Sequence, residues 1–518
     1  MKRLLMTLLT VFAIGGYVFS QGSHWPELNV GPFEGSSPVV AFIQIEGEFI
    51  TADDPYDQIE VAAFVNGDYR GNVYMEDFTL EYGDPYPIVQ LSVFFYENES
   101  EPVTFKMFDH TSGYEYSTYL INQDVITNVD YDQIWMEDYD NALIMNFMPA
   151  LTKDIIGYGT DENPGGYYLV ATPAADGTTP TANNGFVTDA FDLYFFNHDE
   201  LGEEWQNYKE TDFTLSNGQG YLYASAEDTQ LVFEGKLYSG DGVVDLVYNE
   251  AVPELGGWNL VGNPYPAEAG VDREDYYILN GEGSDFIQGS GDVPAMAAIF
   301  VLADEEGESV TFTLADRAQA SPSLALNISQ GRGVVDRAVV RFGEGRKLPK
   351  FQMNPSHTKV YIPQDGKDYA VVRSEGMGEM PVSFKAEKNG SYTLGVNAEE
   401  VSFNYLHLID NMTGADIDLL STPSYSFNAR TTDYASRFKL VFATGNNDGE
   451  NFAFMSNGSI IVSNEGEATL QVIDVNGRIL RSESISGSAS VSMNAAAGVY
   501  MLRLINGSEV KVQKMIVK

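Results

Sequence analysis

Apolar and polar residues alternate with a period of two over much of the first third of the chain. This period is that of a β-strand with one buried face. Residues 46–48 and Asn66-Gly67 are the expected turns after the first two stretches, because glycine and asparagine tolerate positive φ. Four strands at such short spacing predict a β-sandwich over residues 24–140. The alternating apolar positions are Val39, Ala41, Ile43 and Ile45; Ile59, Val61, Ala63 and Val65; Val89, Leu91, Val93 and Phe95; and Val103, Phe105 and Met107.

Two further β-domains are expected downstream. Residues 150–345 hold aromatic-rich stretches that end in glycine or proline, as in Gly-Asn-Pro-Tyr-Pro at 262–266. We expect a jelly-roll-like or double β-sandwich domain there, and the pattern leaves open whether it is one domain or two. Residues 350–445 again alternate with a period of two, most clearly at 392–396 and 438–442, and predict another β-sandwich.

The last segment, residues 446–518, begins with a polar linker and continues as short strands joined by tight turns. We expect the Asn-Gly pairs at 476–477 and 506–507 to occupy the two central positions of such turns. In the final strand Val510 and Val512 are expected to pack against a core while the lysine and glutamine between them face water. This segment predicts a small β-sandwich.

No stretch carries the sustained spacing i, i+3, i+4, i+7 of an amphipathic helix. The 49 glycines and 21 prolines, together with 31 tyrosines and 30 phenylalanines, favour strands and turns instead. The expected fold class is therefore all-β, with tandem β-sandwich or jelly-roll domains and a small C-terminal β-sandwich. A chain of 518 residues fits three or four domains of ordinary size.

Residues 1–21 have the pattern of a cleaved signal peptide. A basic start is followed by an uncharged apolar stretch at 4–19, and Ser20-Gln21 offers a cleavage site. The stretch is shorter than the roughly 20 apolar residues of a membrane span, and no second one follows, so we expect no transmembrane segment after cleavage. The absence of cysteine excludes disulfides, thiolate metal sites and a lipid-modified N-terminal cysteine.

The final strands combine a Gly-Val-Tyr start at 498–500, an Asn-Gly turn and a basic end. In these features the tail resembles the type A C-terminal sorting domain of cargo carried by the type IX secretion system of the Bacteroidetes. The resemblance implies that the export machinery recognises the tail as a partner and removes it. The protein would then pass through the periplasm and be secreted or attached to the cell surface. The residues expected to carry the sorting signal are Gly466, Gly477, Gly498, Val499, Tyr500 and Lys514.

The net charge is −46, from 75 acidic and 29 basic residues. A field of that sign repels nucleic acid, so we expect no nucleic-acid partner. Acidic loops either keep an extracellular protein soluble or hold a structural Ca²⁺ ion, and the sequence leaves both interpretations open. No other cofactor is indicated. Fragments of a calcium-binding loop occur at 239–245, at Asp285 with Asp292, and at 446–449.

The chain offers little for nucleophilic catalysis, which needs an activated hydroxyl or thiol beside a base. It has no cysteine and no Gly-x-Ser-x-Gly segment, and its five histidines are dispersed. His198 is the best single candidate, while His407 lies within an apparent strand and is expected to be structural. Glu203 and Glu204 beside Trp205 would suit a glycosidase, which needs two carboxylates around a sugar.

These features predict a secreted, cell-surface, modular β-protein without catalytic activity that binds a glycan or protein ligand, mediates adhesion or has a structural role. The alternative is a secreted polysaccharide hydrolase with a carboxylate site in the middle domain. Surface-exposed tyrosine and tryptophan around a concave sheet would favour the first, and a deep cleft with convergent carboxylates and a raised pKa the second.

Overall fold

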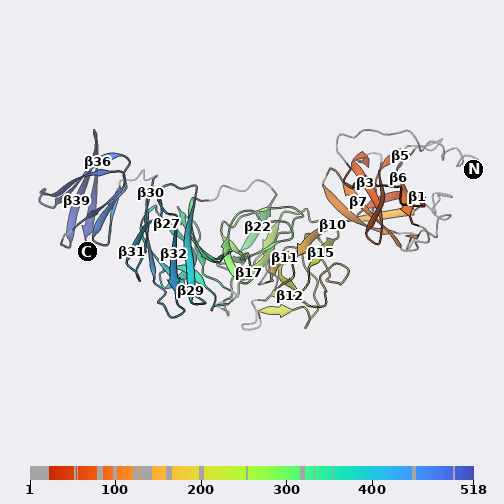
Figure 1. Ribbon diagram of the computed structural model, residues 1–518, viewed down its shortest axis with the longest axis horizontal. Helices are drawn as coiled ribbons and strands as arrows, with labels where there is room; N and C mark the ends of the chain where they lie inside the picture. The colour runs from red at the N-terminus through yellow and green to blue at the C-terminus, as the bar shows by residue number, and fades with distance from the viewer. Residues whose placement is uncertain are drawn as a thin grey trace, which may run out of the picture. The chain divides into compact units, whose positions relative to one another are not determined.

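The protein is almost entirely β-structure in the computed structural model (Figure 1). Among the described residues the one helical element is the single turn η1 (Tyr56–Gln58). The predicted all-β fold class is therefore confirmed. The structure describes residues 23–517 except 52–53, 55, 79–85, 97–101, 112, 121–125, 128–142, 159–165, 198–203, 253–254, 315–320, 332, 353, 446–450 and 494–495. The predicted signal segment and linker thus lie outside the described residues.

The chain divides into two compact units. The N-terminal unit comprises residues 1–152 with 232–237, and the second unit comprises 153–231 with 238–518. The division near residue 152 lies close to the start of the expected middle domain at 150.

The N-terminal unit is built on one long sheet. Its main path runs β4-β3-β7-β8-β10-β1-β6-β5, with β2 beside β1, β9 beside β7 and β15 beside β10. β1 and β10 run parallel, whereas the neighbouring pairs in the path are antiparallel where a register is defined. The strands are β1 (Gly35–Ile45), β2 (Glu48–Phe49), β3 (Ile59–Val65), β4 (Asp68–Tyr74), β5 (Glu76–Phe78), β6 (Tyr86–Phe95), β7 (Pro102–Asp109), β8 (Tyr114–Leu120), β9 (Ile126–Thr127), β10 (Leu143–Ile155) and β15 (Thr229–Glu234).

The predicted alternation in this unit is confirmed in β1 and β7, whereas in β3 the intervening Glu60 and Ala62 are buried as well. Val39, Ala41 and Ile43 of β1 are at most 1% exposed and belong to one hydrophobic core with the apolar positions of β3, β6 and β7. The turn at 46–47 has φ of 52° and 88°, and the turn at 66–67 has φ of 52° and 81°. Positive φ at both positions is the type I′ geometry, whose twist matches that of the strands it joins.

Gly71 of β4 shows how closely the strands of this unit approach one another. A Cβ atom at this position would lie 2.5 Å from the carbonyl oxygen of Ser92 in β6. The two strands are far apart along the hydrogen-bonded path of the sheet, so the sheet folds back on itself and encloses its core. The glycine also has φ of 133°, beside an irregularity in the β3–β4 register.

The first half of the second unit consists of three small sheets, with orders β11-β14-β12-β13, β17-β21-β19-β20 and β16-β22-β18. The two four-stranded sheets share one aromatic-rich core, and the three-stranded sheet covers a second core. The strands are β11 (Tyr168–Ala171), β12 (Phe191–Phe196), β13 (Trp205–Asn207), β14 (Gly220–Ser225), β16 (Val243–Asp245), β17 (Trp258–Gly262), β18 (Gly270–Val271), β19 (Tyr276–Leu279), β20 (Phe286–Gly289), β21 (Ala298–Leu302) and β22 (Ser309–Thr313).

A large sandwich sheet follows, with the order β31-β30-β33-β28-β26-β27-β24-β23-β29-β32 and β25 beside β27. The hairpin β23–β24 lies before the expected boundary at 345, yet β24 pairs in parallel with β27 and β23 pairs with β29. The sandwich therefore begins near residue 323. The strands are β23 (Ser323–Gln330), β24 (Gly333–Phe342), β25 (Leu348–Pro349), β26 (Lys359–Gln364), β27 (Lys367–Ser374), β28 (Met377–Lys385), β29 (Gly390–Glu399), β30 (Phe403–Asp410), β31 (Ala415–Asp418), β32 (Ser424–Ala429) and β33 (Phe438–Thr444).

The C-terminal module has two small sheets, β34-β35-β38 and β37-β36-β39-β40. They enclose a hydrophobic core of their own, which includes Leu470, Leu502 and Met515. The strands are β34 (Ala453–Ser456), β35 (Ser459–Val462), β36 (Glu467–Asp474), β37 (Ile479–Ser486), β38 (Ala489–Ser492), β39 (Gly498–Asn506) and β40 (Glu509–Val517).

Candidate functional site

The residues expected to form the sorting signal all lie in the C-terminal module, but they do not meet at one point. Gly466 and Gly477 stand in turns with φ of 79° and 81°, where an L side chain would be strained. Val499 faces outward and is 37% exposed, whereas the neighbouring Tyr500 is buried and its hydroxyl donates to the carbonyl of Ala496 at 2.8 Å. These residues therefore define a folded module rather than a pocket, and their role in sorting stays a prediction.

Gly498 and Lys514 belong to the final hairpin of this module. Gly498 opens β39 opposite Val517, and Lys514 of β40 is exposed opposite Met501. Both are thus parts of the β39–β40 pair, which runs without a register shift from one end to the other.

The final turn differs from the sequence prediction by one residue. Asn506 pairs with Glu509, so the two central residues are Gly507 and Ser508, and Gly507 alone has positive φ, at 58°. This is the Gly-X arrangement of a two-residue hairpin. At the other predicted turn only Gly477 has positive φ, and a register shift in β36–β37 accommodates the longer loop.

The prediction that Val510 and Val512 pack against the core is wrong. Both side chains are more than half exposed, at 53% and 51%, and the inward positions of β40 are Gln513 and Met515. Gln513 faces inward because its side-chain oxygen accepts hydrogen bonds from the backbone amides of Phe452 and Ala453, each at 2.8 Å. This polar contact fixes the register of the strand.

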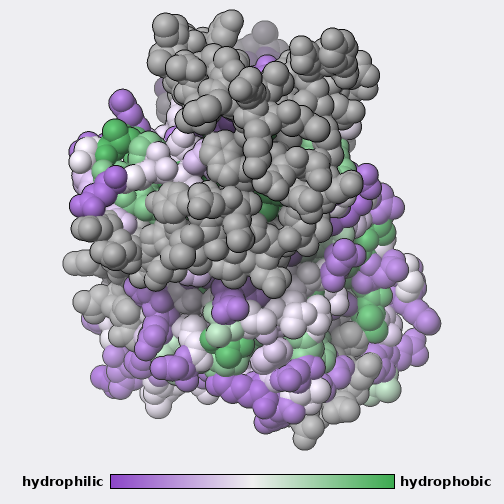
Figure 2. Space-filling model, turned by 90° about the vertical axis from the view of Figure 1, so that its right-hand side faces the viewer, coloured by the Kyte–Doolittle hydropathy of each residue, from purple (hydrophilic) through white to green (hydrophobic). Residues whose placement is uncertain are grey.

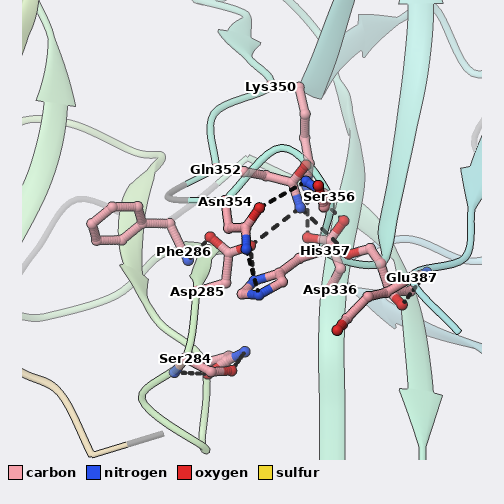
Figure 3. A network of polar contacts seen from close by, with 12 residues as sticks. Ser284, Asp285, Phe286, Asp336, Lys350, Gln352, Asn354, Ser356, His357 and Glu387 are labelled. Carbon is pink, nitrogen blue, oxygen red and sulfur yellow. Dashed lines mark hydrogen bonds and ion pairs between the residues drawn. The ribbon is translucent and has the colours of Figure 1, made fainter. Parts of the chain in front are cut away.

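A second candidate site is a network of polar contacts between the middle sheets and the sandwich sheet (Figure 3). His357 Nδ1 lies 2.8 Å from Asp285 Oδ2, and the other ring nitrogen lies 3.2 Å from the side-chain nitrogen of Asn354. Gln352 and the amide of Phe286 also donate to the Asp285 carboxylate. In a catalytic aspartate–histidine pair the second ring nitrogen would face a nucleophile. Here it faces an amide, so the pair is suited to holding β20 against the segment before β26.

Asp336 and Lys350 form the buried part of the same network. Lys350 Nζ lies 2.5 and 2.7 Å from the two Asp336 oxygens, and both side chains are at most 4% exposed. The amide of Val360 donates to Asp336 Oδ2 at 2.6 Å. Burial raises the pKa of Asp336, while the ammonium group of Lys350 opposes that shift. The pair ties β24 to the residue that follows β25, and the Val360 amide ties β24 to the start of β26.

A third cluster of charges lines a cavity of about 210 Å³ at the same junction. Arg341 binds Asp275 through two nitrogens at 2.8 Å, and Arg373 binds Glu274 at 2.6 Å. Burial alone would raise the pKa of Glu274, but hydrogen bonds from Arg373 and Ser321 outweigh it, so the pKa is lowered. The carboxylates of this cavity are thus matched by guanidinium groups, and the cavity is small for a polysaccharide cleft.

Of the candidate catalytic residues His198, Glu203 and Glu204, the structure describes only Glu204. His198 and Glu203 lie outside the described residues. Glu204 accepts a backbone hydrogen bond from Asn197 at 2.7 Å. The ring of Trp205 packs among aromatic residues of the shared core, 5.2 Å from Phe196 between ring centroids. Trp205 is partly buried and contributes to the packing of this core.

His407 and two of the calcium candidates, Asp241 and Asp285, have local partners. His407 lies in β30, where its Nδ1 is 2.7 Å from Asp416 Oδ1. Asp241 accepts the backbone amide of Val243 at 3.2 Å, and Asp285 is part of the network above. Among the described residues no three acidic or histidine side chains gather in a way that would hold a metal ion. A structural calcium ion stays a prediction.

The N-terminal unit has a group of half-buried and exposed aromatic rings that the sequence did not single out. We call Phe33, Phe94 and Tyr96 the aromatic patch. The Phe33 and Tyr96 rings lie 4.8 Å apart, and the Arg70 guanidinium carbon lies 5.4 and 5.1 Å from their centroids. Tyr96 is 44% exposed. The patch depends on the pairing of Gly35 with Phe95 across β1 and β6, so no local sequence signal could have revealed it.

The surface drawn in Figure 2 shows hydrophilic residues interspersed with small, separate groups of hydrophobic ones. This is the normal surface of a β-protein that meets water. No helix of the described residues is long and apolar enough to cross a membrane.

Comparisons with known proteins identify the C-terminal module. Residues 456–518 match the model of the family described as the secretion system C-terminal sorting domain. No curated protein matches the chain. A solved structure titled "Biofilm associated protein - BSP domain" is similar over 97% of this chain and 99% of its own, at 10% identity and a TM-score of 0.14.

The match to residues 456–518 confirms the resemblance seen in the sequence. This chain carries the sorting tail of type IX secretion cargo. The tail implies export by that route and interaction with its machinery.

Proposed function

We propose that the protein is displayed on the cell surface as a non-catalytic β-protein that binds glycans or proteins through its N-terminal unit. The sorting tail supports the surface location. The observation that carries the binding role is the aromatic patch. Rings held in place by a cation give a rigid contact area at little cost in conformational entropy, and aromatic residues are enriched at binding surfaces.

The partners of the charged groups support a role without catalysis. A hydrolase needs carboxylates or histidines with tuned pKa values that converge on a substrate. In the second unit Asp275, Asp285, Asp336 and Glu274 are instead hydrogen bonded to basic side chains. These contacts hold strands together, which is the role of a structural ion pair.

Binding is tested with the mature protein from Gln21 to about Asn447, screened against glycan and matrix-protein arrays with product analysis of every hit. We expect Tyr96→Ala to lower the affinity for any ligand found in this screen by about tenfold or more. Tyr434→Ala is the matched control, because Tyr434 is similarly exposed, at 49%, on the second unit. Equal effects of both substitutions, or release of hydrolysis products, would refute the proposal.

Export is tested separately by deleting residues 498–518 from the full chain. This removes β39 and β40, and with them Leu502, Leu504 and Met515 from the core of the module. We expect the truncated protein to accumulate in the periplasm with its upstream domains folded. Normal surface levels of the truncated protein would contradict the export route.

A further inference from the structure

The outward side of the β39–β40 hairpin combines apolar residues with two cations and holds no carboxylate. The register places Val499 opposite Ile516, Met501 opposite Lys514, Arg503 opposite Val512, and Ile505 opposite Val510. Facing pairs in an antiparallel ladder share one side of the sheet. We call the side formed by these eight residues the outer hairpin face.

The outer hairpin face is exposed although most of it is apolar. Val499, Val510, Val512 and Ile516 are 37–60% exposed, whereas the alternate residues of the hairpin, such as Leu502, are buried in the module core. Contiguous exposed valine and isoleucine side chains on a stable strand pair are unfavourable in water and mark an interaction site. β40 also ends its sheet, so a partner would reach both the face and an unpaired strand edge.

The charge of this face is the reverse of the charge of the chain. The whole chain carries −46, whereas six basic and seven acidic residues follow Asn447. On the face itself the charged groups are Arg503 and Lys514. Arg503 Nε donates to the side-chain oxygen of Gln471 at 2.8 Å, which holds the guanidinium group along the face.

We infer that the outer hairpin face is the surface by which the tail docks on the export machinery. The inference rests on the proposed export route. The partner is a protein of that machinery with an apolar contact area and carboxylates placed for Arg503 and Lys514. Charge complementarity would steer this partner to the tail, because the acidic upstream domains repel an acidic surface.

The same charges disfavour two other occupants. An anionic membrane is an extended surface, and the acidic remainder of the chain would be repelled by it as the tail approached. A second copy would bring its own Arg503 and Lys514, so two identical faces would place cations near cations. A partner protein can instead carry carboxylates only opposite Arg503 and Lys514, without an extended negative surface that would repel the rest of the chain.

The first test compares surface display of charge-reversed full-length variants. We expect Arg503→Glu with Lys514→Glu to reduce the surface fraction by about tenfold or more and to leave folded protein in the periplasm. Lys511→Glu is the matched control, since it makes the same change on the same strand but opposite inward-facing Leu504. If the double variant is exported normally while the protein lacking residues 498–518 stays in the periplasm, the proposed docking surface is refuted but the export route is not.

The second test identifies the occupant directly. A photo-crosslinking residue at position 512 of the full chain, compared with one at position 511, should capture a component of the export machinery at a segment containing aspartate or glutamate. Protease resistance of each variant checks that the module is folded. Crosslinks from position 512 to lipid or to a second copy, or equal capture from both positions, would overturn the inference.

Discussion

The buried Asp336–Lys350 pair gives the sharpest test of how the second unit is held together. Replacing Asp336 with asparagine keeps the volume and leaves an oxygen to accept the Val360 amide. The variant removes only the charge that compensates Lys350. At 4% exposure the ammonium group cannot recover its hydration without opening the structure.

The expected cost follows from that geometry. Breaking a buried pair by removing one partner typically destabilises a protein by about 3–5 kcal/mol, because an uncompensated charge stays buried. Replacing both partners by neutral groups is often close to neutral. We therefore expect Asp336→Asn to cost about 3–5 kcal/mol, and the double variant with Lys350→Met to recover most of that loss.

The assay is urea unfolding of the mature chain followed by tryptophan fluorescence. Trp258 stacks on Phe351, next to Lys350, with ring centroids 4.6 Å apart, so its emission reports on this junction. A loss of this size shifts the midpoint by about 1 M or more if the slope is near 3 kcal/mol per M. If the single and double variants are equally destabilised, or both unfold like the parent, the reasoning about an uncompensated charge is refuted.

Three further predictions concern the cores and the pH dependence. The pKa of Glu60 is lowered because hydrogen bonds from its neighbours outweigh burial, so the N-terminal unit should lose stability as pH falls below about 4.5, and Glu60→Gln should flatten that dependence in pH-dependent unfolding. Gly71→Ala should destabilise the same unit by about 1–3 kcal/mol more than Gly113→Ala does, because both glycines have positive φ but only a Cβ atom at position 71 would meet the Ser92 carbonyl oxygen. Phe300→Ala should cost about 3–5 kcal/mol in urea unfolding, since Phe300 is fully buried in the shared aromatic core.

Local patterns predicted local structure well. The alternation at 39–45 and the Asn66-Gly67 turn follow from side-chain period and backbone sterics, which act within a few residues. The final hairpin was predicted less accurately, because the turn uses Gly507 and Ser508, and Gln513 is drawn inward by backbone groups some 60 residues away.

Contacts between distant segments set the candidate sites, and the sequence pattern does not report them. Asp285 and His357 are 72 residues apart. They meet because the middle sheets and the sandwich share a core that includes Phe300 and Val371. The aromatic patch likewise depends on the register of β1 with β6. The C-terminal sorting domain could be predicted from the sequence, because its strands and turns lie within one short segment of the chain.

The position of β33 has a mechanical consequence. It precedes the segment that leads to the tail, and it lies between β28 and β30, hydrogen bonded to both. In a protein fixed to the cell surface at this end, a pulling force enters along β33. Hydrogen bonds of an antiparallel ladder lie perpendicular to the strands, so such a force shears two rows of them at once. The strand that receives the load is therefore one of the hardest to pull free.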